Sequence, residues 1–261
     1  MSETNVTDGK KLYICPLTLI FSCCNFTNIV SPSIETRALP MSISSTVLIK
    51  VSKHVNELFD RKSTIAAMYH NFDHTLDVVA NVKEIAKAMD LHGEKTEVIV
   101  IAAWFHDTGY LFSPVEHEER SVKLATKFLK KIGYPEKKIA EVAGCIRATK
   151  VPQRPKNLIE KVMSDADLLS LGKKDSIEKG EMLRAEIENM TGKLMSERMW
   201  IKQSIAFFQD HHYHTEYAIQ YYSENRQRNL KVLQAQLERL DRAHVKKEKA
   251  PVPAAKKSKK K

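Results

Sequence analysis

An apolar run from Val98 to Phe105 is the feature that most restricts how this chain can fold. A helix built from it is apolar on nearly every side, so it belongs in the buried centre of a bundle. The run ends at His106 and Asp107, and Gly109 follows shortly after. Ionisable groups are rarely buried without a partner, and a metal ion is a common partner for a neutral histidine. The run therefore predicts a buried helix that ends at a candidate metal site.

Apolar residues recur at helical spacing through most of the chain after residue 44. Glycine and proline number only 8 and 9 among 261 residues, which favours long helices over a turn-rich sheet. The pattern predicts helices over 45–59, 73–89, 95–105, 114–132, 136–149, 157–170, 174–191, 196–209 and 216–245. The expected fold class is all-α, a helical bundle with a long C-terminal helix. The last helix carries a narrow apolar stripe after Leu230, which fits a projecting helix or one that pairs with another chain in a homo-oligomer.

Composition divides the chain into three parts. Residues 1–40 hold an apolar run of about ten residues, which is too short to span a bilayer as a helix. We interpret 1–40 as sequence translated upstream of a start at Met41, with a signal-like leader in 1–23 as the alternative. Residues 41–245 hold the predicted helices. Residues 246–261 contain eight lysines and one glutamate, a composition typical of a disordered tail.

Charge and cysteine content limit the class of protein. The formal net charge is +10, but +7 of it lies in the lysine-rich tail, so the helical part is only weakly basic. We therefore expect no specific nucleic-acid partner. Three of the four cysteines fall in the first 24 residues, and only Cys145 lies in the helical part. This is no disulfide framework and favours a reducing cytoplasmic location, with a lipoprotein as the alternative if 1–23 acts as a signal.

Three short motifs accompany the buried helix. They are Tyr-His-Asn-Phe-Asp-His at 69–74, His-Asp at 106–107, and Asp-Ala-Asp-Leu-Leu at 165–169. Their order and separation resemble the HD superfamily of metal-dependent phosphohydrolases, and the resemblance runs from about residue 50 to about residue 170 by motif. It implies an all-helical fold, one or two divalent metal ions and cleavage of a phosphate ester, usually in a nucleotide or related small molecule. It does not imply which substrate.

The resemblance also implies the metal ligands. These are His74, His106, Asp107 and Asp167. Asp165 is the rival for the last place, and otherwise we expect it to orient a ligand histidine from outside the ligand set. Ala166-Asp167 matches the family pattern, although Leu168 stands where arginine is usual. Two histidines and two aspartates suit Mn²⁺, Mg²⁺, Fe²⁺, Co²⁺ or Zn²⁺, and the ligand types do not choose among these metals.

His70 is the candidate general acid, and together with Asp107 it forms the expected catalytic pair. Tyr69-His70-Asn71 followed by His74 resembles the corresponding motif of cyclic nucleotide phosphodiesterases, where the first histidine is an acid. The alternative is that His70 only hydrogen-bonds Asp73 or Asp107. Asn71 is expected to support the ligands from outside the ligand set.

Three further residues are candidates for substrate binding. His117 precedes a glutamate, with a serine a few residues later, and many superfamily members place such a histidine toward the pocket. Its alternative is a surface position in a charged run. Lys150 and Arg154 belong to a cationic loop that would bind substrate phosphates, or would simply be solvated.

These features predict a metal-dependent phosphohydrolase that acts on a phosphate ester of a small molecule, with a nucleotide as the expected substrate. The ion would activate water for attack on phosphorus. The alternative is a nucleotide sensor that binds metal without turnover and signals through its C-terminal helix. A third interpretation is an interaction protein whose basic tail binds nucleic acid or a membrane surface.

Overall fold

The structure is a computed structural model that describes residues 45–62 and 67–248. These residues contain no strand, so the all-α prediction is confirmed. The long helices are α1 (Ser45–Lys62), α2 (Phe72–Ala88), α3 (Glu94–Phe105), α4 (His117–Lys131), α5 (Glu136–Ala148), α6 (Leu158–Leu168), α7 (Ser176–Thr191), α8 (Glu197–Asp210) and α9 (Glu216–Glu248). Two short 3-10 helices, η1 (Thr108–Leu111) and η2 (Leu169–Gly172), follow α3 and α6.

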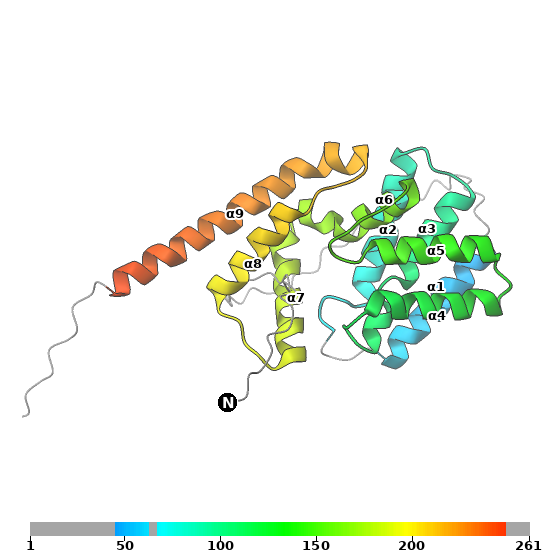
Figure 1. Ribbon diagram of the computed structural model, residues 1–261, viewed down its shortest axis with the longest axis horizontal. Helices are drawn as coiled ribbons and strands as arrows, with labels where there is room; N and C mark the ends of the chain where they lie inside the picture. The colour runs from blue at the N-terminus through cyan, green and yellow to red at the C-terminus, as the bar shows by residue number, and fades with distance from the viewer. Residues whose placement is uncertain (1–44, 63–66, 249–261) are drawn as a thin grey trace, which may run out of the picture.

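Helix α3 lies at the centre of the bundle, as its apolar sequence predicts. Every residue from Val98 to Ala103 is at most 1% exposed, and Phe105 is fully buried. Helices α1, α2, α5 and α6 pack around α3, and α4 covers α5 and η1 (Figure 1). Truncating a buried side chain such as Ile101 to alanine would cost about 2–5 kcal/mol. His106 and Asp107, at the end of α3, therefore follow a helix that is buried in the core.

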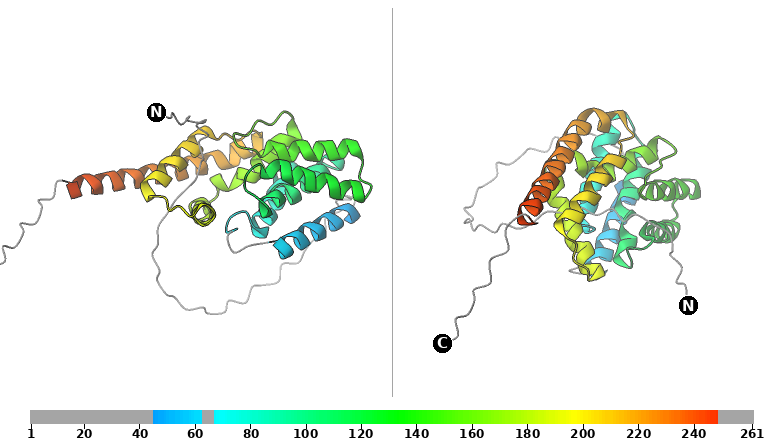
Figure 2. Two further views of the ribbon diagram at one scale, coloured as in Figure 1. Left: turned by 60° about the horizontal axis from the view of Figure 1, so that its bottom comes forward. Right: turned by 60° about the vertical axis from the view of Figure 1, so that its left-hand side comes forward.

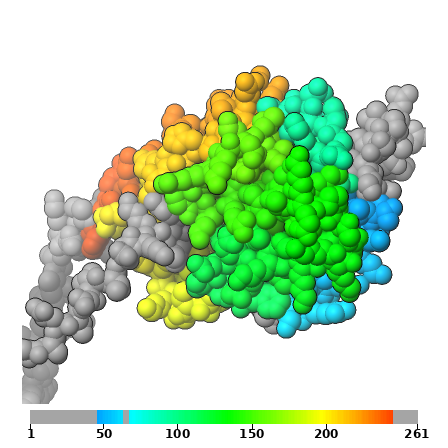
Figure 3. Space-filling model, turned by 45° about the vertical axis from the view of Figure 1, so that its right-hand side comes forward, coloured from blue at the N-terminus to red at the C-terminus, as the bar shows by residue number. Residues whose placement is uncertain are grey.

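Helices α8 and α9 form an outer layer with a small core of their own. Ile201 and Phe208 of α8 pack against Leu230 and Leu233 of α9 in this core. Figures 1 and 2 show α9 running along α8 and extending away from the bundle. Figure 3 shows the same layer, yellow to red, beside the green segment that contains α4 to α6. The apolar stripe after Leu230 is thus covered by α8 of the same chain.

A close approach fixes this layer to the bundle at Gly172, the last residue of η2. A Cβ atom at this position would lie 2.6 Å from the carbonyl oxygen of Tyr222 in α9. Only glycine allows the two backbones to come so near. The long C-terminal helix is therefore anchored at its start, next to the segment that follows α6.

Parts of the sequence predictions fall outside the described residues. These are the interpretation of 1–40 and most of the tail 246–261, although α9 continues to Glu248 and so includes the first residues of that tail. Among the helices that the structure describes, none has the length and apolar content needed to cross a membrane.

Candidate metal centre

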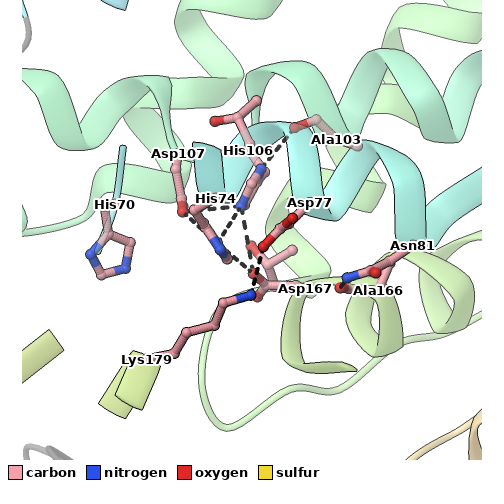
Figure 4. A network of polar contacts seen from close by, with 12 residues as sticks. His70, His74, Asp77, Asn81, Ala103, His106, Asp107, Ala166, Asp167 and Lys179 are labelled. Carbon is pink, nitrogen blue, oxygen red and sulfur yellow. Dashed lines mark hydrogen bonds and ion pairs between the residues drawn. The ribbon is translucent and has the colours of Figure 1, made fainter. Parts of the chain in front are cut away.

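Four side chains from three helices converge on one point. They are His74 of α2, His106 and Asp107 at the end of α3, and Asp167 of α6, and one ligand atom of each lies within 4.8 Å of those of the others. His106 Nε2 lies 3.0 Å from Asp107 Oδ2, and His74 Nε2 lies 3.4 Å from Asp167 Oδ1. Figure 4 shows the four side chains pointing toward one another. These are the four residues that the sequence implied as ligands.

The backbone at the end of α3 explains how neighbouring residues reach one point. Side chains of consecutive helical residues diverge by about 100°. His106 is the last residue with helical dihedral angles, and Asp107 leaves the helix with φ −107° and ψ 6°. Gly109 then lets α4 pass close by, since a Cβ there would lie 2.1 Å from the carbonyl oxygen of His117. The pair therefore sits at a helix end, as the nearby glycine indicated.

Hydrogen bonds outside the cluster hold the ring of His106 and the backbone of His74. His106 Nδ1 lies 2.8 Å from the carbonyl oxygen of Ala103. Donation to this oxygen leaves Nε2 as the nitrogen that faces the cluster. Asn71 caps α2 by accepting from the backbone N–H of His74 at 2.9 Å, so the helix begins at Phe72 and His74 lies in its first turn. Asn71, which we expected to support the ligands from outside the ligand set, is thus the N-cap of α2.

Charge pairing keeps the carboxylates ionised. Burial raises the pKa of Asp107, but His106, His117 and His74 outweigh it and hold this pKa well below its usual value. Burial likewise raises the pKa of Asp167, but His106 and His74 outweigh it and lower this pKa. Ionised carboxylates and imidazole nitrogens are the donors that divalent first-row metals and Mg²⁺ accept. The donor set therefore fits a divalent metal ion, whose identity the ligand types do not decide.

His70 lies beside the cluster and is held by a residue that the sequence did not single out. Its ring centroid is 6.1 Å from that of His74. Its Nδ1 lies 2.5 Å from Glu186 Oε1. The other oxygen of Glu186 accepts from the backbone N–H groups of Tyr69 and His70 at 2.7 Å and 2.9 Å. Tyr110 stacks on the ring at 3.9 Å. The partner of His70 is thus Glu186 of α7, and neither Asp73 nor Asp107 takes that place.

Glu186 is the centre of a small buried network. Its side chain is 0% exposed. Burial raises its pKa, but hydrogen bonds from His70 and Tyr69 outweigh this and lower the pKa. Burial, followed by the nearby Glu186 carboxylate, raises the pKa of Tyr110. The network therefore favours the ionised form of Glu186 next to His70. A glutamate within a polar helix gives no sequence signal for such a role.

The three candidate substrate-binding residues lie in two places. His117 lies at the cluster, with Nε2 3.4 Å from Asp107 Oδ1 and Nδ1 3.1 Å from the carbonyl oxygen of Pro114. Lys150 and Arg154 instead line a hollow of about 340 Å³ together with Arg147, and none of the four clustered residues lines it. The contacts of the described residues thus bring His117 to the site, but not Lys150 or Arg154. Substrate binding by these three residues stays a prediction.

Asp165 has a different place from the one expected. Its carboxylate accepts from the backbone N–H groups of His214 and Thr215, at 2.9 Å and 2.7 Å, and from Thr215 Oγ1 at 2.7 Å. Residues two apart on a helix point to nearly opposite sides, so Asp165 faces away from Asp167. It ties α6 to the start of α9 and orients no ligand histidine.

Comparison with protein families agrees with the motifs. Residues 71–172 match the HD domain family. A crystal structure of a predicted HD superfamily hydrolase from an uncultured Thermotogales bacterium is similar, with a TM-score of 0.49 and 21% sequence identity over 74% of this chain and 92% of that chain. Comparison with curated proteins gave no significant match. Together with the converging histidines and aspartates, the family match identifies residues 71–172 of this chain as an HD domain.

Proposed function

We propose that this protein is a metal-dependent phosphohydrolase that cleaves a phosphate ester of a small molecule, with a nucleotide as the expected substrate. The observation that carries the proposal is the convergence of His74, His106, Asp107 and Asp167 on one point within an HD domain. A divalent ion held there would supply Lewis acidity toward a phosphate oxygen and toward water. The resemblance to the HD superfamily, which usually acts on a nucleotide or a related small molecule, supports the nucleotide.

Asp107 would serve the site with both oxygens. Its Oδ2 lies 3.0 Å from His106 Nε2 and 3.5 Å from His74 Nε2, on the ligand side. Its Oδ1 lies 3.4 Å from His117 Nε2. One oxygen therefore faces the other ligands, while His117 fixes the orientation of the second. This two-sided position supports Asp107 as the residue on which the ligand set depends most.

His70 would act as the general acid. Glu186 occupies Nδ1 at 2.5 Å, so Nε2 is the nitrogen that can give a proton to the leaving oxygen of the ester. The Glu186 contact and the Tyr110 stack at 3.9 Å hold the ring in one orientation. A positioned acid of this kind contributes roughly 10²–10⁴-fold to a rate. The place of His70 beside His74 supports this role.

A hydrolysis panel on the full chain tests the proposal. It would combine Mn²⁺, Mg²⁺, Fe²⁺, Co²⁺ and Zn²⁺ with nucleoside mono-, di- and triphosphates, cyclic nucleotides and a generic phosphodiester. We expect turnover of one substrate class, lost in Asp107→Ala. Metal and nucleotide binding without product, across the whole panel, would instead favour a sensor that does not turn over its ligand.

A further inference from the structure

Two side chains of α7 reach the stretch of chain around the start of α2. Glu186 bonds His70, and Lys179 Nζ lies 2.6 Å from Asp77 Oδ2. His70 and Asp77 are seven residues apart, and so are their partners Glu186 and Lys179. The two segments run in opposite directions, because the earlier residue of one pairs with the later residue of the other. Seven residues are about two helical turns, so Lys179 and Glu186 share one face of α7. This face is turned toward the stretch of chain that carries the metal ligand His74.

The partner of Lys179 lies one helical turn from that ligand. This partner, Asp77, follows His74 by three residues on α2, and residues three apart occupy the same helix face about 5–6 Å from one another. Figure 4 shows the Lys179 side chain extending from α7 toward Asp77, beside the cluster. A positive charge from outside the HD domain match is thus placed next to the proposed metal centre.

The ammonium group of Lys179 has room for a further acceptor. It contacts Asp77 Oδ2 at 2.6 Å and Asp175 Oδ2 at 3.0 Å. A lysine has three N–H donors, so the contacts of the described residues leave one of them for a ligand. The side chains of Asp77 and Asp175 are 48% and 43% exposed. Water can therefore replace the lysine at either carboxylate when another acceptor arrives.

We propose that Lys179 is a substrate-binding residue whose ammonium group contacts a phosphate oxygen of the ligand at the metal centre. This inference deepens the proposed function and rests on it for the idea that a phosphate reaches the centre. The competing role for Lys179 is a latch that only holds α7 against α2. The two roles differ in what the loss of Asp77 does. A latch fails when either partner is removed, whereas a phosphate-binding lysine is freed when Asp77 is removed.

Three full-length variants separate the two roles. Lys179→Met removes the proposed contact, and Asp77→Asn breaks the same ion pair while keeping the lysine. Lys173→Met is the matched control, because Lys173 Nζ bonds Asn81, one turn farther along α2, at 2.6 Å. The measurement is binding of inorganic phosphate to the Mn²⁺-loaded protein by calorimetry, with Mn²⁺ affinity and helical circular dichroism as checks on the site and the fold.

We expect Lys179→Met to weaken phosphate binding about 10- to 100-fold, the range of one hydrogen bond to a charged group. Asp77→Asn and Lys173→Met should leave it unchanged or stronger, and Lys179→Arg should retain most of it.

Equal losses in Lys179→Met and Asp77→Asn, an unchanged affinity in Lys179→Met, or no phosphate binding by the wild type would overturn the inference. If Lys179→Met does not fold, Lys179→Gln replaces it. Loss of phosphate binding in Lys179→Gln, with binding kept in Asp77→Asn, would then support the inference. Lys179-dependent phosphate binding without any turnover would overturn the proposed function and leave this inference standing.

Discussion

The segment from α2 to α6 and the segment from α7 to α9 contribute to the site in different ways. The first supplies the four clustered side chains, and all four lie within the HD domain match. The second supplies Glu186 and Lys179, which reach residues on either side of His74 along the chain. The clustered side chains thus belong to the HD domain match, whereas Glu186 and Lys179, two charged groups beside the cluster, come from α7 beyond that match. The two regions therefore differ in what their side chains would do: the first would hold the metal ion, and the second would adjust the rate and the binding of substrate.

The largest effect should come from the family segment. Asp107→Ala removes a carboxylate that lies within 3.5 Å of His74 and His106. We expect turnover to fall to background and metal affinity to fall by more than about 100-fold, beyond the loss typical of supporting residues. Calorimetry with Mn²⁺ and the hydrolysis assay measure the two effects. Asp60→Asn, an exposed aspartate on α1, is the control. Undiminished hydrolysis in Asp107→Ala would sink the proposed function.

Asp165→Ala should weaken the attachment of the segment from α7 to α9 to the segment from α2 to α6. The carboxylate is buried and accepts hydrogen bonds from three donor groups of His214 and Thr215. Its loss leaves two backbone N–H groups without a partner, which costs about 3 kcal/mol of unfolding free energy. Chemical denaturation measures this cost. Metal affinity per folded molecule should stay unchanged, and a loss of metal affinity without destabilisation would show that Asp165 serves the ligands after all.

His211 gives the α8–α9 layer a pH dependence of its own. Burial lowers the pKa of its imidazole to about 3, and Arg226 adds to the shift. Because this pKa lies below the unfolded value of 6.5, the unfolded chain binds the proton first. Stability is therefore complete above pH 6.5 and falls as the pH drops toward 3, by about 2 kcal/mol at pH 5.

Denaturation at pH 7.5 and pH 5 measures this effect. His211→Gln should flatten the difference between the two pH values, while His212→Gln, at the exposed neighbouring position, should not. An unchanged pH dependence in His211→Gln would mean that other groups carry it. Wild type and both variants are measured without metal, so that metal binding does not contribute to the pH dependence.

The sequence pointed to the four clustered residues more clearly than to their surroundings, since the family resemblance implied all four. His106 and Asp107 stand at the end of an apolar run, where charged groups are costly and therefore informative. The helices follow from apolar spacing that is local in sequence. Glu186 and Lys179 are ordinary residues of a polar helix, and their partners lie 116 and 102 residues away. The partner of Asp165 was missed for the same reason, since the fold alone brings Thr215 to it.

The smallest expected effect, that of Glu186→Gln, tests most directly whether α7 contributes to the rate. Glu186→Gln keeps the shape of the side chain and its bonds to the backbone of Tyr69 and His70, but removes the charge behind the His70 ring. We expect turnover to fall about tenfold, a part of what general acid catalysis contributes, with metal affinity unchanged. Glu178→Gln, an exposed position on the same helix, is the matched control.

The leaving group shows whether Glu186 acts through the acid. A p-nitrophenyl ester needs little protonation as it departs, so Glu186→Gln and His70→Ala should both hydrolyse it nearly as well as the wild type. An alkyl ester should show the full deficit in both variants. Equal losses with the two esters would mean that Glu186 only supports the fold through Tyr69 and His70. In that case the segment from α7 to α9 would support the structure of the site without affecting proton transfer, and the proposed difference between the two regions would be wrong.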